Sequence, residues 1–158
     1  MTKKIIQAIV SILGCLSVGI VGSLFTAPAI PNWYSTLSKP FFSPPSWVFG
    51  PAWTILYILI GISLFLVWTK KADSDIKRNA LYIFFAQLFL NAIWSPIFFG
   101  LQSPFTALII IALLWVTIII NINVFYKVSK TAALLLIPYL LWVSFASVLN
   151  FAIWQLNI

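Results

Sequence analysis

The sequence predicts an all-α integral membrane protein, a five transmembrane helix bundle with a long first loop rich in proline and aromatic residues. Of its 158 residues, 63% are hydrophobic and 7% are charged, against roughly 45–50% and 25% in soluble domains. A chain of this length has too little interior to bury so much apolar surface, so lipid must cover part of it. The apolar residues also form continuous runs of about 20 residues, the length that crosses a bilayer as a helix.

We predict one domain over residues 1–158, with five spans and one lid loop. The spans are about residues 5–25, 51–69, 79–100, 105–126 and 132–154, and the lid loop is 26–50. Strands of a membrane barrel would alternate polar and apolar residues, and these runs do not.

The first span, 5–25, carries a stripe of small residues, which lets helices approach each other closely. The stripe repeats every four residues and consists of Ser11, Cys15, Gly19 and Ser23. A rival interpretation stays open, because Lys3-Lys4, an apolar run and Ala27-Pro28-Ala29 resemble a cleaved secretory signal. The run is longer than the ~7–15 apolar residues of such signals, which favours a span.

Glycine and proline mark the limits of the later spans. Gly50-Pro51 begins the second span, and Gly100 and Pro104 separate the third from the fourth. The fourth span is mostly Ile, Leu and Val, so we expect it to face lipid apart from Thr117 and Asn121.

The short loops divide the basic residues unequally between the two sides. One side carries only Lys39, and the other carries Lys3, Lys4, Lys70, Lys71, Lys77, Arg78, Lys127 and Lys130. Basic loops stay cytoplasmic, so we expect the N-terminus inside, the C-terminus outside and, with short termini, a bacterial plasma membrane. Because the charge flanks the spans, we expect membrane lipid as a partner and no nucleic acid.

The composition excludes most conventional catalytic and metal sites. The chain has no His, one Cys and two acidic residues, Asp73 and Asp75, and its one Met is Met1. Ser–His–Asp triads, paired carboxylates, zinc or di-iron sites and haem held by His are therefore impossible. We expect no catalytic residue, no metal and no obligatory cofactor. Spans two to five contain no ionisable acid or base, which argues against an ion-coupled pump.

Polar and aromatic residues share one face of three spans, and Trp53, Tyr57, Asn91, Trp94, Ala146 and Asn150 lie in the half of the bundle next to the lid loop. These faces comprise Trp53, Tyr57 and Gly61; Gln87, Asn91, Trp94 and Ser95; and Tyr139, Trp142, Ala146, Leu149 and Asn150. They predict a pocket that holds a flat, apolar ligand by stacking, with an amide contact from Asn91. Prolines stiffen the 26–50 loop above it, and we expect Trp33, Pro44, Pro45 and Trp47 to form the lid. Interhelical bonding and interfacial aromatic belts remain alternative explanations.

Three blocks of residues resemble the translocator protein or tryptophan-rich sensory protein family (TspO), also known as the peripheral-type benzodiazepine receptor. They are Trp33-Tyr34 with Lys39-Pro40, Pro44-Pro45, Trp53 and Tyr57; Asn91, Trp94 and Phe98-Phe99-Gly100; and Pro138-Tyr139, Trp142, Ala146 and Leu149-Asn150. The resemblance implies a five-helix bundle, often a homodimer, that binds porphyrins, isoquinoline carboxamides and benzodiazepines. It also implies ligand contacts at Tyr34, Trp53, Asn91, Trp94, Trp142, Ala146 and Leu149.

The family's proposed cholesterol motif is absent, because Leu149 is followed by Phe151 and by no basic residue. The leading hypothesis is a membrane receptor or sensor for metal-free porphyrin, rather than a conventional enzyme. Alternatives are passive transport of porphyrin or lipid-like molecules, light-dependent porphyrin breakdown, and a helix-packing partner for another membrane protein.

Overall fold

The structure is a computed structural model that describes residues 2–158. These residues form helices and loops without any strand, and five helical segments are long and apolar enough to cross a membrane. The prediction of an all-α, five-span bundle is confirmed. The helices are α1 (Thr2–Ala29), η1 (Ile30–Tyr34), η2 (Ser46–Val48), α2 (Phe49–Thr69), α3 (Ser74–Ser95), η3 (Pro96–Gly100), α4 (Pro104–Val128), α5 (Lys130–Leu135) and α6 (Ile137–Leu156).

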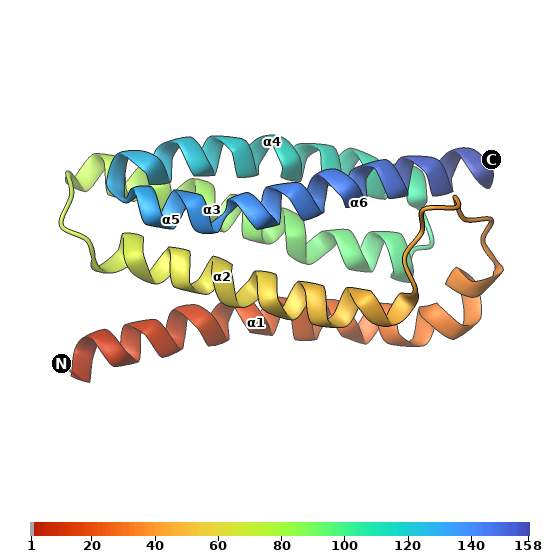
Figure 1. Cartoon of the computed structure of the whole chain (residues 1–158), viewed down its shortest axis with the longest axis horizontal. Helices are drawn as coiled ribbons and strands as arrows, with labels where there is room; N and C mark the ends of the chain where they lie inside the picture. Colours follow the sequence, from red (N-terminus) through yellow and green to blue (C-terminus); the bar gives the residue numbers. More distant parts are fainter. Residues whose placement is uncertain (1) are drawn as a thin grey trace.

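Each of the five segments runs antiparallel to the next one along the chain, so the connections between them alternate between the two ends of the bundle (Figure 1). One end carries the N-terminus, the turn at 70–73 and the turn at 129. We call it the basic end, because every basic residue except Lys39 lies in or next to these segments. The other end carries the 37–45 loop and the C-terminus, and we call it the loop end.

The first helix continues further than predicted, and the loop is correspondingly shorter than 26–50. α1 passes into the π-helical turn η1, so Trp33 lies on a helix and only residues 37–45 form the loop. Prolines lack the N–H of a helix interior, which is why Pro28 and Pro31 favour a loop in the sequence. A π turn absorbs an extra residue, and Asn32 Nδ2 donates to the Pro28 carbonyl oxygen at 2.8 Å.

The fifth span is also different from the prediction of one helix over 132–154. The chain breaks at Leu136 into α5 and α6, and Pro138 lies in the first turn of α6. Proline is tolerated in a first turn, because the N–H there has no partner within the helix. The break positions Tyr139 toward the bundle interior, where its side chain is fully buried.

Small residues bring α1 and α2 into close contact, as the small-residue stripe predicts. A Cβ atom built on Gly61 would lie 2.6 Å from Ile12 Cα, and one on Gly19 would lie 2.6 Å from a ring carbon of Tyr57. Ser11 and Cys15 are buried at the same contact. The two helices therefore touch backbone to backbone toward the basic end.

The expectation that the fourth span faces lipid is wrong for one side of α4. That side carries a buried stripe of Ala107, Ile111, Leu114, Ile118, Phe125 and Val128, and with them Asn121, one of the two exceptions to that expectation. Phe125 stacks on Phe84 of α3, with ring centroids 5.8 Å apart. The span with the smallest buried share is instead the first, Thr2–Tyr34.

Candidate functional site

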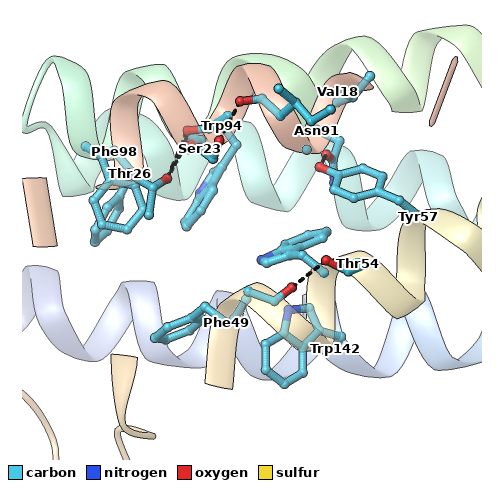
Figure 2. A pocket seen from close by; sticks show the side chains of 18 of the residues that line it. Val18, Ser23, Thr26, Phe49, Thr54, Tyr57, Asn91, Trp94, Phe98 and Trp142 are labelled. Atoms are coloured by element: carbon cyan, nitrogen blue, oxygen red, sulfur yellow. Dashed lines mark hydrogen bonds between the residues drawn. The ribbon is translucent and has the colours of Figure 1, made fainter. Parts of the chain in front are cut away.

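A cavity of about 460 Å³ lies in the loop-end half of the bundle, between α1, α2, α3 and α6. In Figure 2, side chains of α2 and α6 such as Phe49 and Trp142 lie across the cavity from those of α1 and α3 such as Thr26 and Trp94. All eight side chains predicted to bind a ligand line it. They are Tyr34, Trp53, Tyr57, Asn91, Trp94, Trp142, Ala146 and Leu149. The structure thus brings them together, and ligand contact by each stays a prediction.

Aromatic pairs fix the orientation of the three cavity indoles. Trp53 stacks on Tyr57 with ring centroids 5.5 Å apart and 28° between the planes. Trp94 stacks on Phe98 at 5.1 Å and 22°. Phe49 meets the edge of Trp142 at 6.2 Å. Such pairs contribute about 0.5–1.5 kcal/mol beyond their buried area, so the cavity walls are rigid aromatic surfaces.

The floor of the cavity, toward the basic end, is a chain of buried hydrogen bonds. Tyr57 OH donates to Asn91 Oδ1, and Asn91 Nδ2 donates to Tyr139 OH at 2.9 Å. Tyr139 OH in turn donates to Gln87 Oε1 at 3.0 Å. The Asn91 amide is therefore already engaged on both of its atoms, and the floor is closed by bonds between α2, α3 and α6.

Hydroxyl groups line the cavity where α1 meets α3. Thr26 Oγ1 and Ser95 Oγ are 2.7 Å apart, and Ser95 Oγ donates to the Gly22 carbonyl oxygen at 3.0 Å. Deeper in the wall, Trp94 Nε1 donates to Asn150 Oδ1 at 3.2 Å. Every side chain that lines the cavity is uncharged. Over residues 2–158 no group of three His, Cys, Asp or Glu side chains could hold a metal ion.

Comparison with known proteins agrees with this architecture. Residues 11–155 match the TspO/MBR family. The chain belongs to this family. It is 50% identical to the tryptophan-rich protein TspO of Archaeoglobus fulgidus, over 98% of this chain and 99% of that protein. The corresponding protein of Chlorobaculum tepidum is 47% identical over 99% of both chains.

A more distant relative is the human translocator protein, which is 38% identical over 92% of this chain and 84% of its own length. Another relative, from Cereibacter sphaeroides, is a tryptophan-rich sensory protein, 37% identical over 80% of this chain and 77% of its own. The chain is therefore an integral membrane protein of the TspO family, a family of sensor and translocator proteins.

The lid predicted for this TspO-family chain does not form part of the cavity wall. None of Trp33, Pro44, Pro45 and Trp47 lines the cavity. Trp33 lies on η1 and meets the edge of Phe98 at 5.6 Å, behind the wall, and Trp47 is 74% exposed. The sequence places these residues in a loop above the pocket, but the direction of each side chain depends on the π turn and on the short helix η2.

Hydrogen bonds of Ser38 and Lys39 fix the start of the 37–45 loop to the bundle. Lys39 Nζ donates to the carbonyl oxygens of Tyr34 at 2.8 Å and Leu37 at 3.0 Å. Asn157 Oδ1 accepts from Ser38 N at 3.0 Å, and Asn157 Nδ2 donates to Ser38 O at 2.9 Å. The start of the loop is therefore tethered to η1 and to Asn157 just after α6, and none of residues 37–45 lines the cavity.

Removal of this tether gives a testable expectation. We expect Asn157→Ala to speed amide hydrogen exchange at Ser38 about tenfold. The substitution removes the two hydrogen bonds between Asn157 and Ser38, and each contributes ~0.5–1.5 kcal/mol to holding the loop in place. Hydrogen exchange followed by mass spectrometry of the 37–45 peptide measures this, with Asn123→Ala on the exposed face of α4 as the control. An unchanged exchange rate at Ser38 would show that the loop is held by packing alone.

Sequence reasoning missed one entire wall of the cavity. That wall is the α1 face formed by Leu16, Val18, Gly19, Ile20, Gly22, Ser23 and Thr26. Phe49, Phe98 and Phe99 were also not predicted to line it. The stripe of small residues could have indicated this wall. Two of its members, Gly19 and Ser23, line the cavity, because the face of α1 that approaches α2 also borders the cavity.

Proposed function

We propose that this TspO-family chain is a membrane receptor or sensor that binds protoporphyrin-like tetrapyrroles in the cavity described above. The observation that carries the proposal is an uncharged cavity of about 460 Å³ that is lined by three indoles. Its volume falls within the roughly 300–1,000 Å³ of small-molecule sites. Flat aromatic faces at Trp53, Trp94 and Trp142 favour a flat, conjugated ligand over a globular one.

The same lining supports metal-free porphyrin rather than haem. Haem iron needs an axial donor such as His, Cys, Met or Tyr. The chain has no His, its one Met is Met1, and Cys15 does not line the cavity, so the most common axial donors are missing there. Synthetic isoquinoline carboxamides and benzodiazepines are further flat, apolar candidates for the cavity, as the family resemblance implies.

The closed floor supports a receptor more than a passage. A transporter would need a route from the cavity to the basic end, and the Tyr57–Asn91–Tyr139–Gln87 chain lies across that route. We expect liposomes that contain the protein to show no protein-dependent protoporphyrin flux. Measurable flux would favour the alternative of passive transport. Light-dependent breakdown of the ligand is a separate alternative, and its test is product formation after Trp53→Phe and Trp142→Phe.

Titration with protoporphyrin in lipid nanodiscs tests the proposal through quenching of tryptophan fluorescence. We expect Trp142→Ala to weaken binding about tenfold, because loss of one stacking face removes ~1–1.5 kcal/mol. Trp115→Phe is the matched control, since Trp115 lies on the exposed side of α4 and does not line the cavity. Equal affinity of the two variants would contradict a binding site between the indoles.

Orientation and assembly are part of the same proposal. The basic end gathers eight of the nine basic residues of the chain, so we propose that this end is cytoplasmic and that the cavity lies in the outer half of the membrane. A bacterial plasma membrane and a homodimer remain the expectations for location and assembly. Cysteine accessibility at the two ends and crosslinking in membranes test them.

A further inference from the structure

The cavity reaches the side of the bundle between α1 and α2. Four of its lining residues belong to the exposed surface as well: Ile20 and Ser23 on α1, and Gly50 and Thr54 on α2. Ile20 is 64% exposed. Both helices belong to membrane-spanning segments, so this surface faces hydrocarbon, with Gly50 at its edge in the first turn of α2. We call the opening between them the lateral opening.

The lateral opening follows from where α1 and α2 touch. Toward the basic end they are in backbone contact, as the 2.6 Å approach of a Gly61 Cβ to Ile12 Cα indicates. Toward the loop end, a Cβ on Gly50 would meet nothing within 4 Å. At this end the cavity lining includes exposed residues of both helices, so we take the cavity to open to the side there.

The polar groups at the lateral opening are already satisfied by their own helices. Ser23 Oγ donates to the Ile20 carbonyl oxygen at 2.6 Å, and Thr54 Oγ1 donates to the Gly50 carbonyl oxygen at 2.9 Å. A hydrocarbon chain that passes them displaces no hydrogen bond, so it carries no desolvation cost for these hydroxyls.

We propose that the lateral opening admits an acyl chain of a phospholipid in the adjoining leaflet, and that this chain fills the cavity when no other ligand is bound. An apolar cavity open to hydrocarbon gains dispersion contacts when a chain enters. Water has too few polar partners in such a cavity to compete. The lipid headgroup stays at the interface near the first turn of α2, where Gly50 lies. A tetrapyrrole would then have to displace the chain.

Photolabelling in nanodiscs tests this with phosphatidylcholine that carries a diazirine at mid-chain. Irradiation yields a carbene that inserts into side chains in contact, and peptide mass spectrometry locates the adducts. We expect adducts at Phe98 and Leu149, which are 2% and 5% exposed and which lipid outside the bundle does not reach. Val116 on the outer face of α4, 48% exposed, reports ordinary lipid contact.

Two variants determine the route of entry. Gly50→Phe places a ring at the lateral opening, and the site accepts it because a Cβ there has no neighbour and the glycine φ is not positive. Gly14→Phe is the matched control, since its Cβ also has no neighbour and Gly14 does not line the cavity. We expect Gly50→Phe to lose the adducts at Phe98 and Leu149, and Gly14→Phe to keep them.

Ser23→Phe closes the same opening from α1 and serves if Gly50→Phe does not fold. Absence of adducts at Phe98 and Leu149 in the unaltered protein would overturn the proposal. Equal labelling of these residues in the closed variants and in the control would overturn it as well. The experiment uses lipid alone, so failure of the proposed porphyrin function leaves its outcome unaffected.

Discussion

Replacement of Gly61 by alanine is expected to lower the free energy of unfolding by about 3 kcal/mol, the upper range for an overpacked site. The added methyl would lie 2.6 Å from Ile12 Cα and 3.0 Å from the Ser11 carbonyl oxygen. Both atoms are backbone, so no side-chain rotation relieves the clash, and α1 must move away from α2. Denaturant unfolding in micelles, followed by near-ultraviolet circular dichroism, measures the loss.

Gly14→Ala is the control for Gly61→Ala. Gly14 lies on the exposed side of α1, and a Cβ there meets nothing within 4 Å. Alanine is a better helix former than glycine by about 0.8–1 kcal/mol, so we expect Gly14→Ala to be neutral or slightly more stable. Equal effects of the two substitutions would mean that α1 does not pack against α2 at Gly61.

The span arrangement could be predicted because lipid imposes a simple rule on length and charge. A helix must present about 20 apolar residues to hydrocarbon, and basic residues must remain outside it. The pocket residues could be predicted for a related reason. Trp53, Asn91 and Trp142 contrast with an otherwise aliphatic sequence, and helical spacing assigns each to one face.

The buried face of α4 could not be predicted, because hydrophobicity does not distinguish a protein interior from lipid. Ile111, Ile118 and Phe125 are buried, whereas Val116 and Ile120 of the same helix are 48% and 42% exposed. All five are suited to both surroundings. The same ambiguity concealed the α1 wall of the cavity, which contains no indole and no amide.

The predicted lid loop, 26–50, begins earlier than the observed loop, 37–45, because proline is compatible with two different backbone structures. Proline lacks the N–H of a helix interior, so Pro28 and Pro31 favour a loop in the sequence. The chain instead continues through a π turn, and Ser35 Oγ donates to the Pro31 carbonyl oxygen at 2.8 Å. Pro96 begins a second π turn, η3, in the third span. Local hydrogen bonds of this kind depend on side-chain rotamers, which a sequence pattern does not specify.

Tyr139→Phe is expected to lower the free energy of unfolding by about 2–3 kcal/mol, although it removes a single oxygen atom and creates almost no space. Tyr139 is fully buried, and its hydroxyl both accepts from Asn91 Nδ2 and donates to Gln87 Oε1. Without it, one Asn91 hydrogen and the Gln87 oxygen lose their partner inside the bundle. Gln87 Nε2 is already buried without a partner, so the Gln87 amide would then have none.

A single hydrogen bond in a membrane protein usually contributes only ~0.6 kcal/mol, because the alternative state finds other partners. Tyr139→Phe differs because it leaves two polar groups unpaired, and each costs ~1–3 kcal/mol when buried. A double-mutant cycle separates these effects. We expect Gln87→Leu to restore part of the stability in the Tyr139→Phe background, since it removes one of the unpaired groups.

Tyr139→Phe and Trp142→Ala should affect different properties of the protein: the first mainly its stability, the second mainly its affinity for the ligand. Tyr139 does not line the cavity, so we expect its substitution to lower stability while protoporphyrin affinity changes less than about threefold, under 1 kcal/mol. Trp142→Ala should weaken binding more. Tyr82→Phe, at a position 66% exposed, is the control for removal of a tyrosine hydroxyl. If Tyr139→Phe weakened binding as much as Trp142→Ala, the hydrogen-bonded floor itself would be part of the ligand site.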